Sequence, residues 1–250
     1  MTTMSYVEVH FHLLPGVDDG PTSIEESLAL AAAAVADGTR TVVATPHVRT
    51  EFVSDPTEVP VRVQELVDRL RRERIRLDVL PGGELALELV GSLTARQLEA
   101  IAHGPAGRRW LLLEAPFDGL EPGFTAAADE LRERGFAVVV AHPERALRTR
   151  ATLAALEHEV ESGSALQLNA WSFAGLYGGR VRTEALRLLR WAPRAVIASD
   201  AHGEARMPAL RLALGALAAA GERDPGRFAG AIPRALLEQG VAVRPAVVLA

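Results

Sequence analysis

The sequence predicts an α/β protein, and three observations favour a closed barrel of parallel strands. Strand-like and helix-like segments alternate along the 250 residues with no linker-like gap, internal repeat or low-complexity tract. The strand-like segments are nearly continuous apolar runs, as in parallel sheets that are buried on both faces. A chain of this length commonly forms one barrel domain. We therefore expect a single domain over residues 1–250, with an open doubly wound sheet as the alternative.

Local signals predict the first strands and helices. Residues 5–11 (SYVEVHF) are β-branched and aromatic with alternating polarity, which is typical of a strand. Ser23 has the position of a helix N-cap, and Glu26 three residues later completes a capping box. Pro46 stops a second strand-like run at residues 40–47. A segment with helical apolar spacing and a third strand follow at 58–75 and 77–84.

The remaining units repeat this order. Further buried strands are expected at residues 108–116, 136–143, 164–170 and 193–202. The helices that follow them are expected at residues 124–135, 151–163, 182–191 and 208–221. The chain therefore contains about seven β–α units. The final residues, 241–250, are expected to form an extra strand or a docked tail.

Composition excludes several classes of function. The chain has no cysteine, which rules out disulfides, thiolate zinc sites and a cysteine nucleophile, and which fits a reducing compartment. A formal net charge of -5 argues against a nucleic-acid-binding surface. The N-terminus does not resemble a signal peptide, and the most apolar stretch is too short to span a membrane and contains Arg211. We expect a cytoplasmic protein without stable membrane insertion.

Potential metal ligands lie where the expected strands end. Two aspartates, Asp18 and Asp19, lie in a Pro/Gly turn shortly after the first strand, and the sixth strand ends in Asn169. Because the carboxyl ends of barrel strands share one rim, residues far apart in the sequence are expected to meet in one pocket. The His, Glu and Asp residues at the other strand ends are His10, His12, His47, Glu84, Glu114, His142, Asp200 and His202.

The residue types and spacing suit a cation cluster. Residues i and i+2 of a strand share a face, so His10 and His12 can point at one ion, and Asp200 and His202 repeat that offset. Histidines mixed with carboxylates, without thiolates, favour Mn²⁺, Fe²⁺ or Zn²⁺ over Ca²⁺ or Mg²⁺. Five histidines and four carboxylates exceed the needs of one ion, so two or three metals are expected.

Any one of these motifs is more often structural than functional. A single HxH pair commonly packs or faces solvent, and a lone Glu at a strand end is usually a solvated loop residue or a helix-capping acid. The metal interpretation depends on coincidence, because five of the seven histidines lie at predicted strand ends. The other two, His103 and His158, lie in helical or loop sequence and are expected to be surface residues.

Two arginines closely follow the candidate ligands. Arg145 lies just past His142, and Arg206 lies just past His202. Beside a metal centre, a guanidinium typically binds an anionic group such as phosphate; the alternative is a loop arginine paired with a neighbouring Glu. The charged run at residues 68–76 is expected to be a solvated helix face, and YGGR at 177–180 a turn.

The motifs HFHLLPGVDDGP, VVATPH, LPGGE, LLLEAP, VVVAHPER, LQLNA and SDAH cover nearly the whole chain in order. In this set the chain resembles the polymerase and histidinol phosphatase (PHP) superfamily, and within it the CpsB/CapC-type tyrosine phosphatases of bacterial capsule and exopolysaccharide systems. The resemblance implies a distorted (β/α)7 TIM-like barrel of the PHP type and a trinuclear centre that prefers Mn²⁺. It also implies hydrolysis of phosphotyrosine on the tail of a tyrosine kinase.

By position, the resemblance assigns phosphate contacts to Arg145 and Arg206, and it selects Asp19 rather than Asp18 as a ligand. The sequence departs from the family pattern at Glu8, where Asp is usual, at bulky Trp171, and in the segment 48–60. These departures bear on the substrate pocket. The implied metal ligands are His10, His12, Asp19, His47, Glu84, Glu114, His142, Asp200 and His202.

The hypothesis is therefore a metal-dependent phosphomonoester hydrolase that uses metal-activated hydroxide, most simply a manganese-dependent protein-tyrosine phosphatase. A phosphatase for histidinol phosphate or another small phosphomonoester is the nearest alternative. A catalytically silent barrel that binds its kinase is a third interpretation, and the intact ligand set argues against it. The oligomeric state stays open.

Overall fold

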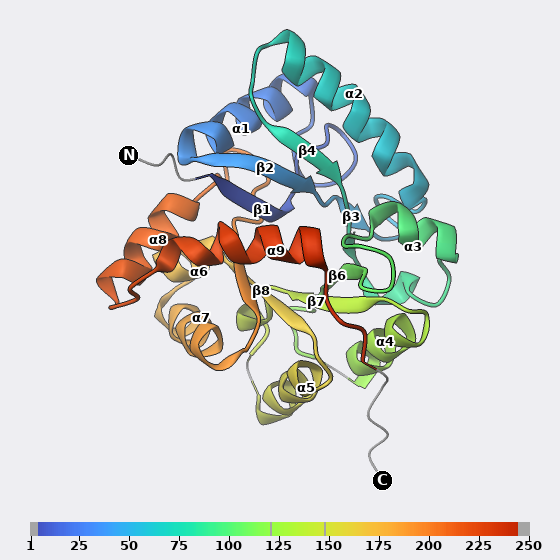
Figure 1. Cartoon of the computed structure of the whole chain (residues 1–250), viewed down its shortest axis with the longest axis vertical. Coiled ribbons are helices and arrows are strands. Elements are labelled where there is room, and N and C mark those ends of the chain that lie inside the picture. The colour runs from blue at the N-terminus through green and yellow to red at the C-terminus, as the bar shows by residue number, and fades with distance from the viewer. Residues whose placement is uncertain (1–4, 121, 148, 245–250) are drawn as a thin grey trace.

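A computed structural model describes residues 5–120, 122–147 and 149–244, and parallel strands form its centre with helices around them (Figure 1). The strands are β1 (Tyr6–Phe11), β2 (Thr39–Ala44), β3 (His47–Val48), β4 (Asp78–Pro81), β5 (Glu84–Leu85), β6 (Trp110–Glu114), β7 (Ala137–Ala141), β8 (Ala165–Asn169) and β9 (Ala195–Ala198). The helices are α1 (Ile24–Asp37), α2 (Val59–Arg72), α3 (Ala95–Ile101), α4 (Pro122–Glu133), α5 (Arg150–Glu161), α6 (Ala170–Ala174), α7 (Gly179–Trp191), α8 (Leu210–Ala219) and α9 (Ala231–Gln239).

The strands form two parallel sheets that follow one another around the barrel wall. One sheet has the order β1-β2-β4, and the other has the order β3-β5-β6-β7-β8-β9. The ends of the wall meet where Phe11 bridges Ala201 in parallel and the Asp200 N–H donates to the His10 carbonyl at 3.0 Å. This arrangement confirms the expected distorted barrel with seven strand positions.

The second and third expected strands are each divided in two. Pro46 has no N–H to donate, and the chain passes from β2 to β3, and so into the other sheet, across it. Gly82 and Gly83 divide β4 from β5 in the same way, and a Cβ added at Gly82 would lie 2.4 Å from the Val43 side chain. Close backbone approach therefore requires glycine here, and His47 and Glu84 pair directly as the first residues of β3 and β5.

The amino end of the barrel is closed by a helix that local sequence signals did not predict. In Figure 1, α9 crosses in front of the strands. The indole of Trp110 donates to the carbonyl of Leu236 at 2.9 Å, and both residues join an inner apolar cluster with strand residues from β1, β2 and β6 to β9. The carboxyl ends are therefore the open side of the barrel, where polar side chains can gather.

His103 corrects one expectation. It packs against Trp110, with ring centroids 5.1 Å apart, and its Nε2 is shielded from solvent. Burial lowers its pKa to about 4. The residue is half-buried, with its ring packed inward beside Gly82, and is not the surface histidine that its position suggested. His158 is half-buried on α5.

The start of α1 holds the loop that carries Asp18 and Asp19. Ser23 caps the helix by accepting from the Glu26 N–H at 3.2 Å, as predicted. The Glu26 carboxylate bonds the backbone N–H of Thr22 at 2.7 Å and its hydroxyl at 3.0 Å. The predicted capping box would have the Glu26 carboxylate accept from the N–H of Ser23. It accepts instead from the N–H of Thr22, one residue earlier, and so anchors the loop there.

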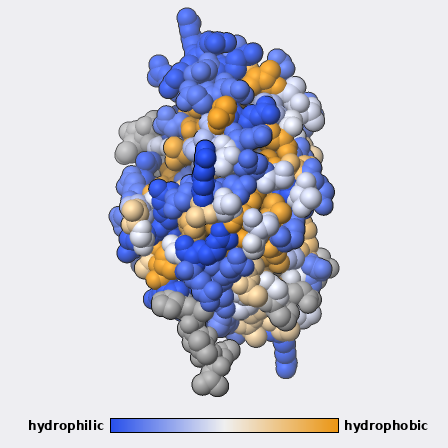
Figure 2. Space-filling model, turned by 90° about the vertical axis from the view of Figure 1, so that its right-hand side faces the viewer, coloured by the Kyte–Doolittle hydropathy of each residue, from blue (hydrophilic) through white to orange (hydrophobic). Residues whose placement is uncertain are grey.

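The expected charged helix face at residues 68–76 is correct only in part, because α2 ends at Arg72 and residues 73–76 lie beyond it, although most of the run is exposed. Figure 2 shows a mostly hydrophilic upper end, where α2 lies in Figure 1, and smaller hydrophobic patches below it. Within the described residues, no helix is long and apolar enough to cross a bilayer. Residues 241–244 form no regular element, although Val241 is buried, and residues 245–250 of the expected tail lie outside the described part.

Candidate metal centre

The predicted ligands meet at the carboxyl ends of the strands. Three overlapping groups of donor atoms form there, and within each group the atoms lie within 4.8 Å of one another. The Nε2 of His142 adds a ninth residue, because it lies 2.9 Å from Glu84 Oε1. The groups are His12, Asp19, His47 and His202; His10, His12, Glu84 and Asp200; and His47, Glu84 and Glu114.

Glu84 lies at the middle of this cluster. Its Oε2 is 3.1 Å from His10 Nε2, 3.3 Å from His12 Nε2 and 3.1 Å from His47 Nδ1. The side chain is 1% exposed, so its charge is shielded from water. A carboxylate that belongs to two donor groups could contribute to holding a cation in each of them.

The two aspartates of the first loop have different positions. Asp18 accepts from His12 Nδ1 at 2.7 Å and from the His47 N–H at 3.0 Å, so it orients two cluster histidines. Asp19 Oδ1 lies 3.4 Å from His47 Nε2 and 3.3 Å from His202 Nε2. Of the two, only Asp19 belongs to a donor group, which agrees with its selection as the ligand.

Polar side chains behind the cluster fix the histidine rings. Gln167 accepts from His10 Nδ1 at 2.8 Å, and the carbonyl of Asp200 accepts from His202 Nδ1 at 2.9 Å. Metal-binding histidines typically donate one ring nitrogen in this way while the other faces the metal. Asn169 donates to Asp200 Oδ2 at 2.9 Å and thereby orients a carboxylate.

Several buried side-chain nitrogen and oxygen atoms that could bind a metal have no hydrogen-bond partner within the described residues. They include His47 Nδ1, Glu84 Oε2 and His202 Nε2. Buried polar atoms are normally paired, and leaving one unpaired costs about 1–3 kcal/mol. Because all three belong to residues of the donor groups, the chemistry of this site fits divalent cations.

The electrostatics of the cluster favour a bound cation. Burial, together with the charge of Glu84, raises the pKa of Glu114 to about 7. Burial lowers the pKa of His47 to about 4, so this ring is neutral and able to ligate. The His202 ring, whose Nε2 lies 3.3 Å from Asp19 Oδ1, holds the pKa of Asp19 well below its usual value. The carboxylates of the cluster also raise the pKa values of His10 and His12, so several negative charges converge where a cation would bind.

Backbone strain is concentrated at the same rim. His142 has φ 36° and Asp200 has φ 50°, in the left-handed region that non-glycine residues rarely adopt. Among the other non-glycine residues that the structure describes, only Arg74 has a positive φ. Strained residues persist where the surrounding structure holds them, and they are common at functional sites.

Both predicted arginines reach the cluster, and a third joins them. Arg206 donates to Asp200 Oδ2 at 2.7 Å, and Arg145 lies 3.4 Å from the same oxygen. Arg49 donates to Glu114. Sequence reasoning missed Arg49, although it lies two residues past His47, much as Arg145 lies three past His142.

Comparison with known proteins agrees with this geometry. The profile of the capsular polysaccharide synthesis family CpsB/CapC matches residues 6–224. The chain belongs to the CpsB/CapC family. It is 35% identical to the tyrosine-protein phosphatase YwqE of Bacillus subtilis over 199 residues, which is 78% of this chain and 77% of YwqE.

Solved structures extend the family comparison. The chain matches a crystal structure from work on YwqE of Bacillus subtilis and CpsB of Streptococcus pneumoniae, described as metal-dependent tyrosine phosphatases. The TM-score is 0.82 at 32% identity, with 98% of this chain and 99% of that chain covered. The phosphotriesterase homology protein of Escherichia coli shares the fold alone, with a TM-score of 0.52 at 15% identity, covering 82% of this chain and 85% of that chain.

Exposed aromatic side chains border the centre in this CpsB/CapC chain. Phe52 is 39% exposed and stacks on His47 at 5.8 Å, and Phe117 is 46% exposed and stacks on His142 at 5.5 Å. Phe117 also lies 4.3 Å from the Arg145 guanidinium. The side chains that stack on His47 and His142 are thus apolar and available to a ligand.

The departures from the CpsB/CapC pattern have structural explanations. Glu8 is fully buried and accepts from the Ser199 N–H at 2.7 Å, and burial raises its pKa to about 8. It therefore joins β1 to the residue before Asp200. Trp171 donates to the Met207 carbonyl at 2.9 Å. The atypical segment 48–60 supplies Arg49 and Phe52.

Proposed function

We propose that this chain is a metal-dependent protein-tyrosine phosphatase that acts on a phosphotyrosine-bearing tail of a tyrosine kinase in capsule or exopolysaccharide biosynthesis. The observation that carries the proposal is the gathering of nine His, Asp and Glu side chains, with Glu84 at the middle of the cluster. The relative YwqE, at 35% identity, bears the name of this activity. We also propose that residues 1–250 form one domain and that the protein is cytoplasmic.

The proposed cofactor is two or three divalent cations, with Mn²⁺ preferred and Fe²⁺ or Zn²⁺ as alternatives. Mixed imidazole and carboxylate donors without thiolates support this preference. The proposed ligands are His10, His12, Asp19, His47, Glu84, Glu114, His142, Asp200 and His202. When bound, such ions supply a Lewis acid for the phosphoryl oxygens and lower the pKa of water.

The chain's own arginines neutralise the substrate. Arg145 and Arg206 flank Asp200 at the open side of the cluster, and both are partly exposed and permanently charged. They bind the phosphoryl oxygens and stabilise the charge that develops on them during transfer. Arg49, beside Glu114, offers a third guanidinium. The phosphoryl group is thus held between the cation site and the arginines.

The aromatic border of the site suits an aryl ester. Phe52 and Phe117 present exposed apolar rings beside His47 and His142, and aromatic rings pair favourably with a phenyl leaving group. Tyrosine, with a pKa of about 10, leaves without strong acid assistance. The chain has no cysteine, so a cysteinyl-phosphate intermediate is excluded. These features disfavour histidinol phosphate, a cationic alkyl ester.

The experiment is a metal add-back assay. The protein is stripped with a chelator, restored separately with Mn²⁺, Fe²⁺, Zn²⁺ or Mg²⁺, and assayed on a phosphotyrosine peptide, a phosphoserine peptide and histidinol phosphate. We expect activity to return most with Mn²⁺ and to favour the phosphotyrosine peptide. A preference for histidinol phosphate, or activity that does not respond to any metal, would contradict the proposal.

A further inference from the structure

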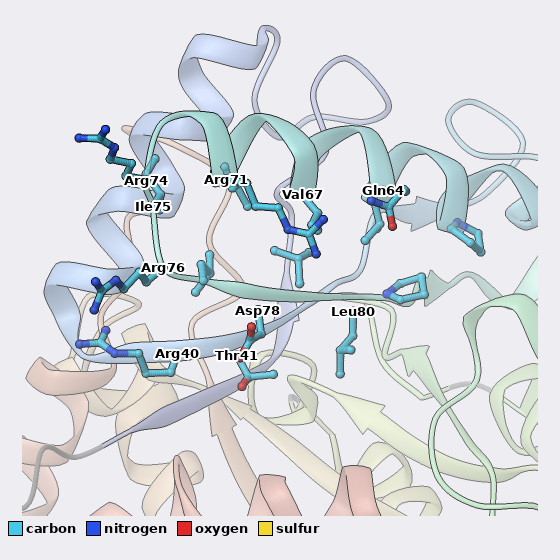
Figure 3. A pocket seen from close by; sticks show the side chains of 16 residues that line it. Arg40, Thr41, Gln64, Val67, Arg71, Arg74, Ile75, Arg76, Asp78 and Leu80 are labelled. Carbon is cyan, nitrogen blue, oxygen red and sulfur yellow. The ribbon is translucent and has the colours of Figure 1, made fainter.

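A long groove lies between α2 and the edge strand β4, on a different part of the molecule from the metal centre. It has a volume of about 1180 Å³, and we call it the α2/β4 groove (Figure 3). One end is lined by Pro60 and Pro81, and the other end reaches Arg40 near the amino end of β2. The groove therefore extends away from the carboxyl ends of the strands, where the candidate ligands lie.

One wall of the groove is a strand edge. β4 ends its three-stranded sheet, so within the described residues it pairs with β2 on one side only. Edge strands present unpaired N–H and C=O groups that can pair with an added extended chain. A strand edge that faces a helix across a groove is a common site for such strand addition.

The groove is strongly basic at one end. Arg74, Arg76 and Arg40 lie together there, and Arg71 reaches from α2 toward β4 (Figure 3). Asp78 is the only carboxylate among the lining residues. Arg71 pairs with Asp68 at 3.4 Å, but both are well exposed, so this ion pair contributes little and is easily exchanged. The positive end stands out in a chain whose net charge is -5.

Arg74 occupies a position that favours glycine. It has φ 58° two residues after the end of α2, and its N–H donates to the Arg71 carbonyl at 3.1 Å. Glycine is the usual residue in this left-handed conformation after a helix, because a side chain there costs about 1 kcal/mol. The basic end of the groove therefore has an arginine with a strained backbone where a glycine would be unstrained.

The middle of the groove is apolar. Val67 and Leu80 are half-buried and line it between the proline end and the arginine end, and half-buried Ile75 lies beside Arg74 at the arginine end (Figure 3). In an extended peptide, alternate side chains point to opposite faces. A peptide lying along β4 can therefore place apolar side chains on this floor and acidic side chains toward the arginines.

We propose that the α2/β4 groove docks an extended acidic segment of another protein, which pairs with the free edge of β4. The strand edge recognises the backbone of the segment, the apolar floor receives alternate side chains, and the arginines select negative charge. The inference goes beyond the proposed catalytic function and does not depend on it, since none of the groove residues belongs to the metal centre.

The test measures binding of a defined probe to the full chain. The probe is a fluorescein-labelled decapeptide of alternating Glu and Val, followed by fluorescence anisotropy. The test variant combines Arg71→Glu with Arg76→Glu. The control variant combines Arg62→Glu with Arg72→Glu. Both residues lie on α2, as Arg71 does, and neither lines the groove, and the control changes the net charge by the same amount as the test variant. A second probe carries N-methyl groups on alternate residues and cannot complete strand pairing.

We expect the test variant to bind the probe at least about tenfold more weakly, and the control variant to bind within about twofold of wild type. The N-methylated probe should also lose at least about tenfold, and hydrolysis of p-nitrophenyl phosphate should not change in either variant. Three results overturn the proposal: no binding of the probe at millimolar concentration, equal losses in both variants, or unchanged binding of the N-methylated probe. Binding of phosphatidylglycerol vesicles, but not of the peptide, that is lost in the test variant would assign the groove to membranes and also overturn it.

Discussion

Asp18 offers a sharp test of how the candidate metal centre is built, because its carboxylate touches the cluster without joining it. It accepts hydrogen bonds from His12 Nδ1 at 2.7 Å, from the His47 N–H at 3.0 Å and from the Gly20 N–H at 2.9 Å. All three partners are donors. Asp18→Asn keeps the size of the side chain, but in either orientation its NH₂ group faces a donor. The substitution therefore removes the hydrogen bonds that orient His12 and His47, while all nine proposed ligands stay in place.

The expected magnitude follows from these contacts. A hydrogen bond to a charged acceptor is worth about 1.5–3 kcal/mol, and residues that orient metal ligands typically contribute about 10–100-fold to metal affinity or activity. We expect Asp18→Asn to weaken apparent Mn²⁺ affinity by about 10–100-fold. We expect turnover at saturating Mn²⁺ to fall much less, because the ligands themselves remain. Asp19→Asn, which alters a proposed ligand, should lower both quantities.

The assay is a Mn²⁺ titration of chelator-stripped protein, followed by calorimetry and by hydrolysis of p-nitrophenyl phosphate. The exposed Asp224→Asn is the matched control and should titrate like wild type. Thermal melting of the stripped variants separates metal affinity from folding. If Asp18→Asn titrates within about twofold of wild type, the orienting role inferred from the hydrogen bonds is refuted.

Three further outcomes are expected. Arg145→Ala should cut kcat/KM for p-nitrophenyl phosphate by about 100-fold or more without changing Mn²⁺ content; near-normal rates would exclude a phosphate contact. Phe52→Ala with Phe117→Ala should lower the preference for phosphotyrosine over phosphoserine peptides by about tenfold, judged from kcat/KM, and an unchanged ratio would exclude an aryl pocket. His103 has a pKa of about 4 in the folded chain against the ordinary histidine value of 6.5, so the unfolded chain takes up its proton first as pH falls. In chelator, wild type should therefore lose up to about 3 kcal/mol of unfolding free energy between about pH 7 and pH 4 that His103→Gln does not lose; parallel denaturation curves would contradict this.

Strand periodicity predicted most of the fold because buried parallel strands are recognisable as apolar runs. The same signal could not show that the second and third strands are divided. That division depends on Pro46, which cannot donate, and on Gly82, whose missing Cβ lets the chain approach Val43. It also could not predict α9, because a helix that closes a barrel is specified by distant contacts, such as the hydrogen bond from Trp110.

The position of the candidate centre was predictable because parallel strands deliver their carboxyl ends to one rim. The residues that orient the ligands were harder to predict. Gln167 lies within a strand, and Asp18 was set aside in favour of its neighbour. Arg49 had a weak signal in its distance from His47. His103 was misjudged because local sequence does not show that a loop histidine packs against Trp110.

The central claim is that one cluster of nine side chains holds two or three cations around Glu84. Anomalous diffraction at the manganese edge, from crystals of the Mn²⁺-loaded protein, tests it most directly. The account predicts two or three anomalous peaks among these side chains, with Asp19 contacting a metal ion and Asp18 contacting none. Peaks elsewhere, or no peak beside Glu84, would contradict it.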